Sequence, residues 1–192
     1  MRLFSHYNFK FMTYTLVIMA ITLHGCTKSG WQAKVDSELS AFGHRNWIVV
    51  ADAAYPKQSS PGIETIVTGE GQLEVLTVVL KKIESAPHVR AIVFLDKELE
   101  AVTEKDAPGV GAYRIQLKEL LENSKVQTLP HEQIISKLDE ASQLFNILLL
   151  KTNITLPYTS VFLQLDCGYW TEEKEARLRH ILDGNTVNKN PL

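Results

Sequence analysis

The sequence contains little cysteine and has no strong excess of either charge. Only Cys26 and Cys167 occur among the 192 residues, so there is no basis for a framework of structural disulfides. The formal net charge is −2, and the basic residues are scattered rather than gathered along one stripe. This distribution gives no indication of a nucleic-acid partner or of an anionic surface as a partner.

Motifs for metals and phosphorylated cofactors are also lacking. The segment HEQII, which begins at His131, has no second histidine as a zinc-binding HExxH helix requires, and the six histidines show no paired spacing. No GxGxxG or GxxxxGK[ST] pattern occurs, which leaves no signature of a nucleotide-binding loop. We therefore expect neither a metal nor a cofactor.

An apolar run that is too short to span a bilayer comfortably lies near the N-terminus. A weakly basic leader precedes the apolar residues 15–23, and LHGC follows at residues 23–26. This order resembles a bacterial lipoprotein signal peptide, and the resemblance implies cleavage before Cys26 and lipidation of its sulfur. The protein is then expected to be lipid-anchored in the cell envelope, facing the periplasm or the surface. An uncleaved signal anchor is the alternative interpretation.

The rest of the chain has the length and the apolar content of one domain, because 45% of the residues are hydrophobic. We predict a signal peptide over residues 1–25, a tether over 26–34 and one domain over 35–170. Residues 171–192 are expected to form a short helix, which begins with an N-cap threonine, and then a disordered tail.

Hydrophobic periodicity predicts alternating strands and helices inside the domain. Helical patterns cover residues 73–83, 113–124 and 131–142, and in the second of these Ile115, Leu117, Leu120 and Leu121 are expected to face inward. Strand patterns cover residues 47–51, 63–68, 89–95, 126–129, 146–152 and 160–166. The alternation predicts an α/β layered domain, and the last two strands are close enough in sequence to pair antiparallel, so we expect a mixed sheet.

Three polar residues stand out as candidates for a functional site. Asp52 ends a strand that is apolar throughout, and it is either a turn-former or part of a ligand site. His44 follows a helix C-terminus, where a solvated histidine is the alternative explanation. His131 begins a helix after Pro130, where a role at the start of the helix is the ordinary one.

Four segments together resemble the RbsD/FucU family of D-ribose pyranases and L-fucose mutarotases. They are AFGHRNWIVVADAAYP (41–56), GIETIVTGEGQLEVLTVVL (62–80), LPHEQIISKLDEASQ (129–143) and LPYTSVFLQLDCG (156–168). The resemblance implies a three-layer α/β fold with a mixed sheet flanked by helices. It also implies that this chain interconverts the cyclic forms of a free monosaccharide, without a cofactor, as a ring-shaped homo-oligomer with sites near subunit contacts.

The resemblance also implies roles for individual residues. His44 matches the family's proton-donor histidine, Asp52 and His131 match its sugar-contacting aspartate and histidine, and Tyr158 matches the tyrosine of its Tyr-Ala-Asn segment. Ser160 stands where that segment has asparagine, and we expect it to contact substrate with a shorter reach. The family's Gly-Glu pair before this segment is replaced by Asn and Ile at 153–154.

Ring opening of an aldose requires only acid–base groups, each of which contributes on the order of 10²–10⁴ in rate. An extended path of ~3.3 Å per residue would separate His44 from Asp52 by roughly 26 Å, too far for both to grip one sugar. Either the chain folds back between them or they meet across a subunit boundary.

A non-catalytic sugar-binding envelope lipoprotein is the alternative function, and a structural envelope protein is a third.

Overall fold

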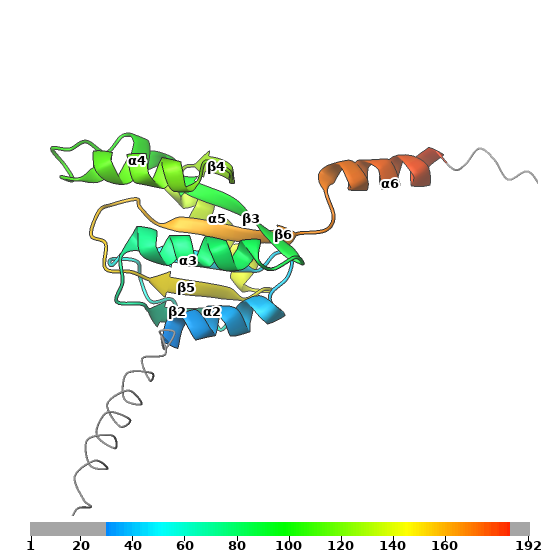
Figure 1. Ribbon diagram of the computed structural model, residues 1–192, viewed down its shortest axis with the longest axis horizontal. Helices are drawn as coiled ribbons and strands as arrows, with labels where there is room; N and C mark the ends of the chain where they lie inside the picture. Colours follow the sequence, from blue (N-terminus) through cyan, green and yellow to red (C-terminus); the bar gives the residue numbers. More distant parts are fainter. Residues whose placement is uncertain (1–29, 185–192) are drawn as a thin grey trace, which may run out of the picture. The chain divides into compact units, whose positions relative to one another are not determined.

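The computed structural model describes residues 30–184, which form a six-stranded sheet with helices on both faces (Figure 1). The helices are α2 (Gly30–Ala41), α3 (Gln72–Glu84), α4 (Val110–Leu120), α5 (His131–Ser142) and α6 (Glu172–Gly184), together with the 3₁₀ turn η1 (Lys97–Glu100). The strands are β1 (Trp47–Ala51), β2 (Ile63–Val67), β3 (Val89–Asp96), β4 (Lys125–Leu129), β5 (Ile147–Lys151) and β6 (Val161–Cys167).

The sheet is mixed, as the sequence predicted, and its strand order is β2-β5-β1-β6-β3-β4. β1, β2 and β5 run parallel to one another, as do β3 and β4, while β6 is antiparallel to both of its neighbours, β1 and β3. The expected pairing of the last two strands is wrong, because β1 lies between β5 and β6. The loop 152–160 therefore crosses the carboxyl end of β1 before β6 begins.

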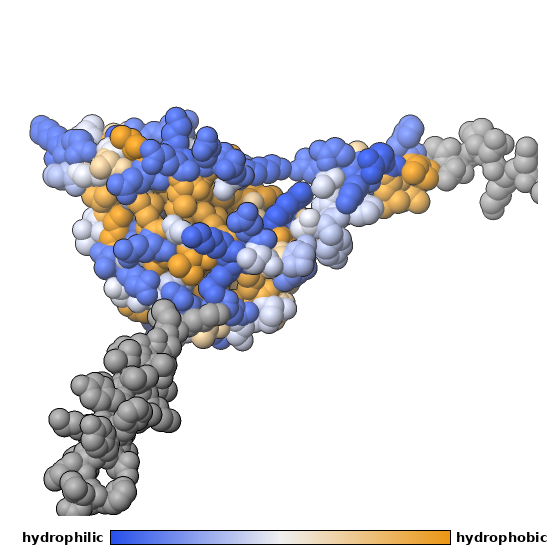
Figure 2. Space-filling view, in the orientation of Figure 1, coloured by the Kyte–Doolittle hydropathy of each residue, from blue (hydrophilic) through white to orange (hydrophobic). Residues whose placement is uncertain are grey.

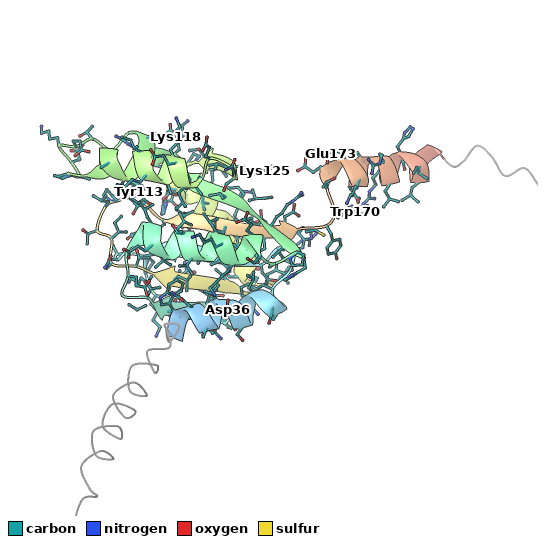
Figure 3. All side chains as sticks on the ribbon, in the orientation of Figure 1. Asp36, Tyr113, Lys118, Lys125, Trp170 and Glu173 are labelled. Carbon is teal, nitrogen blue, oxygen red and sulfur yellow. The ribbon has the colours of Figure 1, made fainter. Side chains whose placement is uncertain are left out.

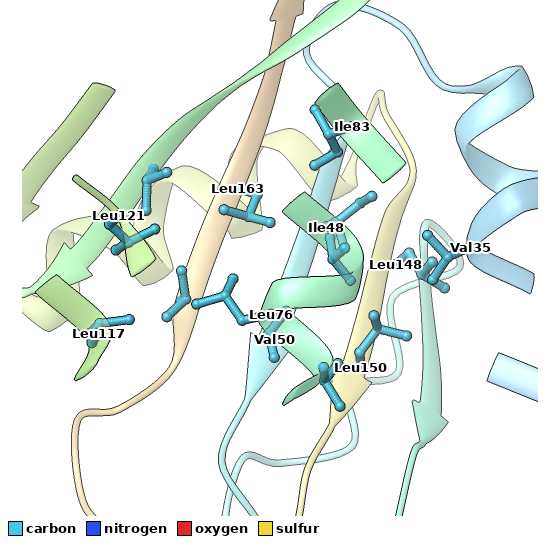
Figure 4. Packing of buried hydrophobic residues seen from close by; sticks show 14 of the residues in the cluster. Val35, Ile48, Val50, Leu76, Ile83, Leu117, Leu121, Leu148, Leu150 and Leu163 are labelled. Atoms are coloured by element: carbon cyan, nitrogen blue, oxygen red, sulfur yellow. The ribbon is translucent and has the colours of Figure 1, made fainter. Parts of the chain in front are cut away.

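β1 is buried along its whole length, which explains its uninterrupted apolar sequence. Ile48 and Val50 face one cluster, built with α2, α3 and α4, and this cluster is drawn in Figure 4. Trp47 and Val49 face a second cluster, which includes Ile134 and Leu138 of α5. The sheet thus lies between three helices and one helix, which confirms the predicted three-layer α/β architecture.

Two sequence predictions are corrected by the packing. Ile115 was expected to face inward but is 62% exposed, because α4 already begins at Val110 and buries Val110, Tyr113 and Leu117. The register i, i+3, i+7 places position 115 on the opposite side of the helix. The predicted tether is helical from Gly30 onward, since Trp31 is buried and its Nε1–H donates a hydrogen bond to Glu70 at 2.8 Å.

The C-terminal helix forms where it was predicted. The Thr171 hydroxyl accepts a hydrogen bond from the backbone N–H of Lys174 at 3.3 Å, which is the contact of an N-cap residue. The predicted signal peptide, the lipidation site Cys26 and the predicted disordered tail lie outside the described residues. Within residues 30–184, no helix is long and apolar enough to cross a membrane.

Candidate active site

A cavity of about 420 Å³ opens at the edge of the sheet where β1 and β3 end and β6 begins. Its lining includes Asp52, Tyr55, Asp96, His131 and Tyr158, and we call it the sheet-edge cavity. The topology explains the gathering: β6 runs antiparallel between β1 and β3, so the loop before β6 meets their carboxyl ends. Ligands of α/β proteins commonly bind at this edge of the sheet.

Asp52 is held in place by both of its carboxylate oxygens. Oδ1 accepts a hydrogen bond from the backbone N–H of Ala54 at 2.8 Å, and Oδ2 accepts one from the Ser160 hydroxyl at 2.8 Å. The Asp52 backbone N–H in turn donates to Ser160 Oγ at 3.2 Å. Asp52 therefore fulfils both of the roles that the sequence allowed, since it stabilises the turn and also lines the cavity. Ser160 is only 2% exposed and is not among the residues that line the cavity.

Asp96 forms a buried pair with His131. Asp96 is 1% exposed, and its Oδ2 lies 3.1 Å from Nδ1 of His131, which leads α5 at the cavity wall. The two groups lack the alignment of a full hydrogen bond, and neither Asp96 oxygen has another partner among the described residues. Burial raises the pKa of Asp96 to about 6, although His131 opposes the shift.

The start of α5 is fixed independently of this pair. The Glu98 carboxylate accepts the His131 backbone N–H at 3.0 and 3.1 Å, so it satisfies one of the free donors at the helix N-terminus. A negative group at this end of a helix is also favoured by the helix dipole. The backbone of His131 is thereby anchored while its ring lies between Asp96 and Tyr158, with the His131 and Tyr158 ring centroids 5.8 Å apart in an edge-to-face arrangement.

Tyr158 has a left-handed backbone conformation, with φ of 59°, which is uncommon for a residue with a side chain. The next residue is fixed by a buried network: the Thr159 carbonyl accepts hydrogen bonds from the Tyr113 hydroxyl at 2.9 Å and from Gln72 Nε2 at 2.8 Å. Tyr113 lies on α4 and is labelled in Figure 3. The network holds the loop in a strained turn that presents Tyr158 at the cavity.

His44 lies at the other end of β1, in the turn Gly43–Asn46, and it is not part of the sheet-edge cavity. Five extended residues at ~3.3 Å each place the two ends of β1 roughly 17 Å apart. His44 Nε2 is 3.7 Å from Asp166 Oδ1, and Arg90 binds the other oxygen of Asp166 at 2.6 Å. Burial opposes the charge of Asp166, but Arg90 holds its pKa below the usual value.

Of the predicted site residues, the structure therefore brings three together in one cavity: Asp52, His131 and Tyr158. Ser160 hydrogen-bonds to Asp52 but does not line the cavity, and His44 lies far from the cavity within a single chain. Asp96 was not predicted from the sequence, although it resembles Asp52 in being an aspartate at the carboxyl end of an apolar strand. Among residues 30–184, no group of three or more His, Cys, Asp or Glu side chains could hold a metal ion.

The layered fold and its polar edge cavity define an α/β domain suited to a small polar ligand. The chain belongs to the RbsD / FucU transport protein family, whose model matches residues 31–167. This match covers nearly the whole described domain and ends at the last residue of β6. Helix α6 lies beyond it.

The structure is similar to that of Bacillus subtilis RbsD complexed with D-ribose, at 19% identity and a TM-score of 0.51, covering 76% of this chain and 96% of that one. A fucose mutarotase from Streptococcus pneumoniae, solved in complex with L-fucose, matches at 20% identity over 68% of this chain and 89% of that one, with a TM-score of 0.47. Curated proteins include no significant match to the sequence. At 19% identity, the similarity to RbsD shows a shared fold.

We expect Ser160→Ala to weaken about tenfold the binding of any small polar ligand that Asp52 holds in the cavity, because a hydrogen bond to a charged group contributes about 1.5 kcal/mol or more and its loss frees the Asp52 carboxylate. Titration of the variant with a panel of small polar ligands, free monosaccharides among them, followed by NMR or calorimetry, measures the effect. Ser136→Ala, which removes a hydroxyl bonded only within α5, is the matched control. Equal affinities of the parent and Ser160→Ala would show that Asp52 needs no support from this position.

Proposed function

We propose that the protein is a mutarotase or pyranase that interconverts the cyclic forms of a free monosaccharide. The observation that carries the proposal is the sheet-edge cavity, in which Asp52, His131 and Tyr158 surround a space suited to one sugar. Family membership supports it, since structures of the family include a fucose mutarotase bound to L-fucose and RbsD bound to D-ribose.

The cavity offers the groups that the reaction requires. Interconversion removes a proton from the anomeric hydroxyl, protonates the ring oxygen, opens the sugar to the aldehyde and closes it again. Nδ1 of His131 is buried against Asp96, so Nε2 is the ring nitrogen left for substrate. An imidazole can donate or accept a proton near neutral pH. The fixed Asp52 carboxylate accepts hydrogen bonds from sugar hydroxyls, and Tyr158 covers the ring.

His44 enters this mechanism through a second subunit. Within one chain His44 lies at the opposite end of β1 from Asp52, and the chain does not fold back to bring the two residues together. A homo-oligomer in which one protomer's His44 turn meets its partner's cavity supplies the second acid–base group. The turn is well suited to a fixed position, because Arg45 adopts φ of 79° and its backbone N–H donates to the Leu165 carbonyl at 2.9 Å.

The separation of His44 from the sheet-edge cavity within one chain favours a second candidate function, that of a non-catalytic sugar-binding protein. A chain whose cavity lacks His44 retains Asp52, His131 and Tyr158, which are enough to bind a sugar. Exchange NMR with a panel of free monosaccharides separates the two candidates. Faster interchange between anomer or ring-form signals supports the enzyme, and line broadening without faster interchange supports the binding protein.

We further propose that the protein is anchored in the envelope through a lipid on Cys26, because the LHGC segment follows an apolar run. Cys26→Ser is expected to move the protein into the soluble fraction and to abolish labelling by a fatty-acid probe. Fractionation and labelling of cells that express the parent and the variant measure both effects. Unchanged membrane attachment of the variant favours an uncleaved signal anchor.

A further inference from the structure

The loop that follows β1 contributes two polar side chains to the sheet-edge cavity, Tyr55 and Gln58, to which the proposed reaction assigns no role. Tyr55 is 5% exposed, and Gln58 is half-buried. A sugar requires polar partners, which the exposed apolar side chains Leu178, Ile181 and Leu182 near the end of α6 (Figure 2) do not supply. We call the two cavity residues the Tyr55–Gln58 pair.

Tyr55 is held in place by its backbone and by its ring. Its N–H donates a hydrogen bond to the Asp52 carbonyl at 3.3 Å, and the N–H of Ala53 donates to the Ile154 carbonyl at 2.8 Å, which joins this turn to the loop before β6. The Tyr55 ring lies in the second of the two buried clusters, with its centroid 6.4 Å from that of Phe162. The Tyr55 hydroxyl therefore has a defined position relative to the Asp52 carboxylate.

The two side chains of the pair share one hydrogen bond, which leaves the tyrosine proton and the glutamine oxygen without a partner. Gln58 Nε2–H donates to the Tyr55 hydroxyl oxygen at 3.4 Å. Within residues 30–184, the Tyr55 proton has no acceptor and Gln58 Oε1 has no donor. A free hydroxyl donor and a free carbonyl acceptor therefore lie beside each other at the cavity.

The Tyr55 hydroxyl remains protonated near neutral pH. Burial raises the pKa of Tyr55, and the carboxylates of Asp139, Asp96 and Asp52 raise it further. The hydrogen bond from Gln58 opposes this rise in pKa without cancelling it. Tyr55 is thus a hydrogen-bond donor in a cavity where Asp52 is an acceptor. A buried O–H without an acceptor costs free energy, so a ligand oxygen that accepts this proton is favoured.

We propose that Tyr55 and Gln58 together bind one hydroxyl group of the sugar and thereby determine which sugars the cavity prefers. A sugar hydroxyl can accept the Tyr55 proton and donate its own proton to Gln58 Oε1, so it satisfies both groups at once. The hydrogen bond between Gln58 and Tyr55 keeps the two partners at a fixed spacing. This role rests on the proposed function in one respect, that the ligand is a sugar, and it holds for a catalyst and for a binding protein alike.

Other ligand groups match the Tyr55–Gln58 pair less well than a hydroxyl does. A methyl group would leave both the donor and the acceptor unpaired, which a site built for a hydroxyl penalises. A carboxylate or a phosphate would accept the Tyr55 proton, but it has no proton for Gln58 Oε1 and would be repelled by Asp52. An ammonium group could donate to Gln58 Oε1 but has no acceptor for the Tyr55 proton. The expected ligand is therefore a sugar with an uncharged hydroxyl at this position.

Tyr55→Phe tests this role, because it removes the hydroxyl and keeps the ring that packs near Phe162. Calorimetry measures the binding of D-ribose, L-fucose and D-galactose to the purified full chain, and then of the monodeoxy analogues of the tightest binder, which lack each of its hydroxyl groups in turn. We expect the loss of one particular hydroxyl to weaken binding to the parent at least about tenfold and binding to Tyr55→Phe less than about twofold. The preferences for the other hydroxyls should be the same in both proteins.

Gln58→Met, which keeps the length of the side chain but lacks the amide, should lose the preference for the same hydroxyl. Tyr169→Phe is the matched control, since Tyr169 is 68% exposed and does not line the cavity. The proposal is wrong if Tyr55→Phe keeps every preference of the parent, or if Tyr55→Phe and Gln58→Met lose preferences for different hydroxyls. Either result leaves the proposed function standing, because sugar exchange by the parent is measured separately. A parent that binds none of the three sugars would contradict both proposals.

Discussion

Asp96→Asn is expected to make the protein more stable by about 2–3 kcal/mol at pH 8 and to slow sugar interconversion by tenfold or more. The gain in stability arises because the ionised Asp96 carboxylate is buried and neither of its oxygens has a hydrogen-bond partner among the described residues. A neutral amide costs less to bury than a charge. The loss of activity arises because His131 loses the carboxylate that lies against Nδ1.

The sign of the pH dependence follows from the raised pKa of Asp96, about 6 against an ordinary 3.8. The folded state prefers the protonated carboxyl, so the stability that this group contributes is fully present below pH 3.8 and is lost as the pH rises through about 6. The stability difference between Asp96→Asn and the parent should therefore be near zero at pH 4 and grow toward pH 8. Urea unfolding at several pH values measures it.

Asp166→Asn provides a control of opposite sign. The pKa of Asp166 is held low by Arg90 against the effect of burial, so its ionised form stabilises the folded state. Asp166→Asn should lower stability at neutral pH, and the difference should shrink as the pH falls. If Asp96→Asn is also destabilising at pH 8, the Asp96–His131 pair is a favourable ion pair and the interpretation of a strained buried acid is wrong.

Co-expression of two inactive variants is expected to restore sugar interconversion. His44→Ala and Asp52→Asn should each retain about 1% of parental activity or less, because each removes a group that takes part in proton transfer or holds the sugar. If His44 of one protomer completes the cavity of its partner, random mixing in equal amounts leaves about a quarter of the sites with both native residues. Exchange NMR on co-purified, differently tagged chains measures the recovery.

Asp52→Asn co-expressed with His131→Asn is the matched control. Both residues line the cavity of the same chain, so no mixed assembly contains a site with both native residues, and no recovery is expected. Recovery in this control would mean that the cavity itself is shared between protomers. No recovery with His44→Ala and Asp52→Asn would show that His44 does not complete the cavity of a partner protomer.

The fold could be predicted largely from local patterns. The apolar run at residues 47–51 correctly predicted a strand buried on both faces. The mixed character of the sheet was also predicted, although the antiparallel pairing of the last two strands on which that prediction depended does not occur. The strand order could not be predicted, because pairing of β1 with both β5 and β6 depends on long-range contacts that periodicity does not encode. Leu117 and Leu121 are buried as predicted, but the orientation of Ile115 was wrong and the helix begins three residues earlier than predicted, because Val110–Ala112 gave no clear helix signal.

The candidate site was predicted in part. Asp52 and His131 were candidates from their positions in the sequence and from the family resemblance, Tyr158 came from the resemblance alone, and all three line one cavity. Asp96 was missed because its importance comes from the antiparallel β6, which carries the loop before it to the ends of both β1 and β3. Ser160 was expected to contact the sugar, but its hydroxyl donates a hydrogen bond to Asp52 instead. The two residues are 108 positions apart in the sequence, so no local sequence pattern could predict this contact.

Two-dimensional exchange NMR of free monosaccharides with catalytic amounts of the purified full chain tests the central claim most directly. Ribose, fucose and galactose are measured at equilibrium, with and without protein, and with His131→Asn as a variant that lacks the imidazole. The proposed function predicts that cross-peaks between ring forms or anomers of at least one sugar build up much faster with the parent than without protein, and that His131→Asn lowers this rate by about 10²-fold or more. Interchange at the uncatalysed rate for every sugar, together with line broadening that reveals binding, would contradict catalysis and identify a sugar-binding protein instead.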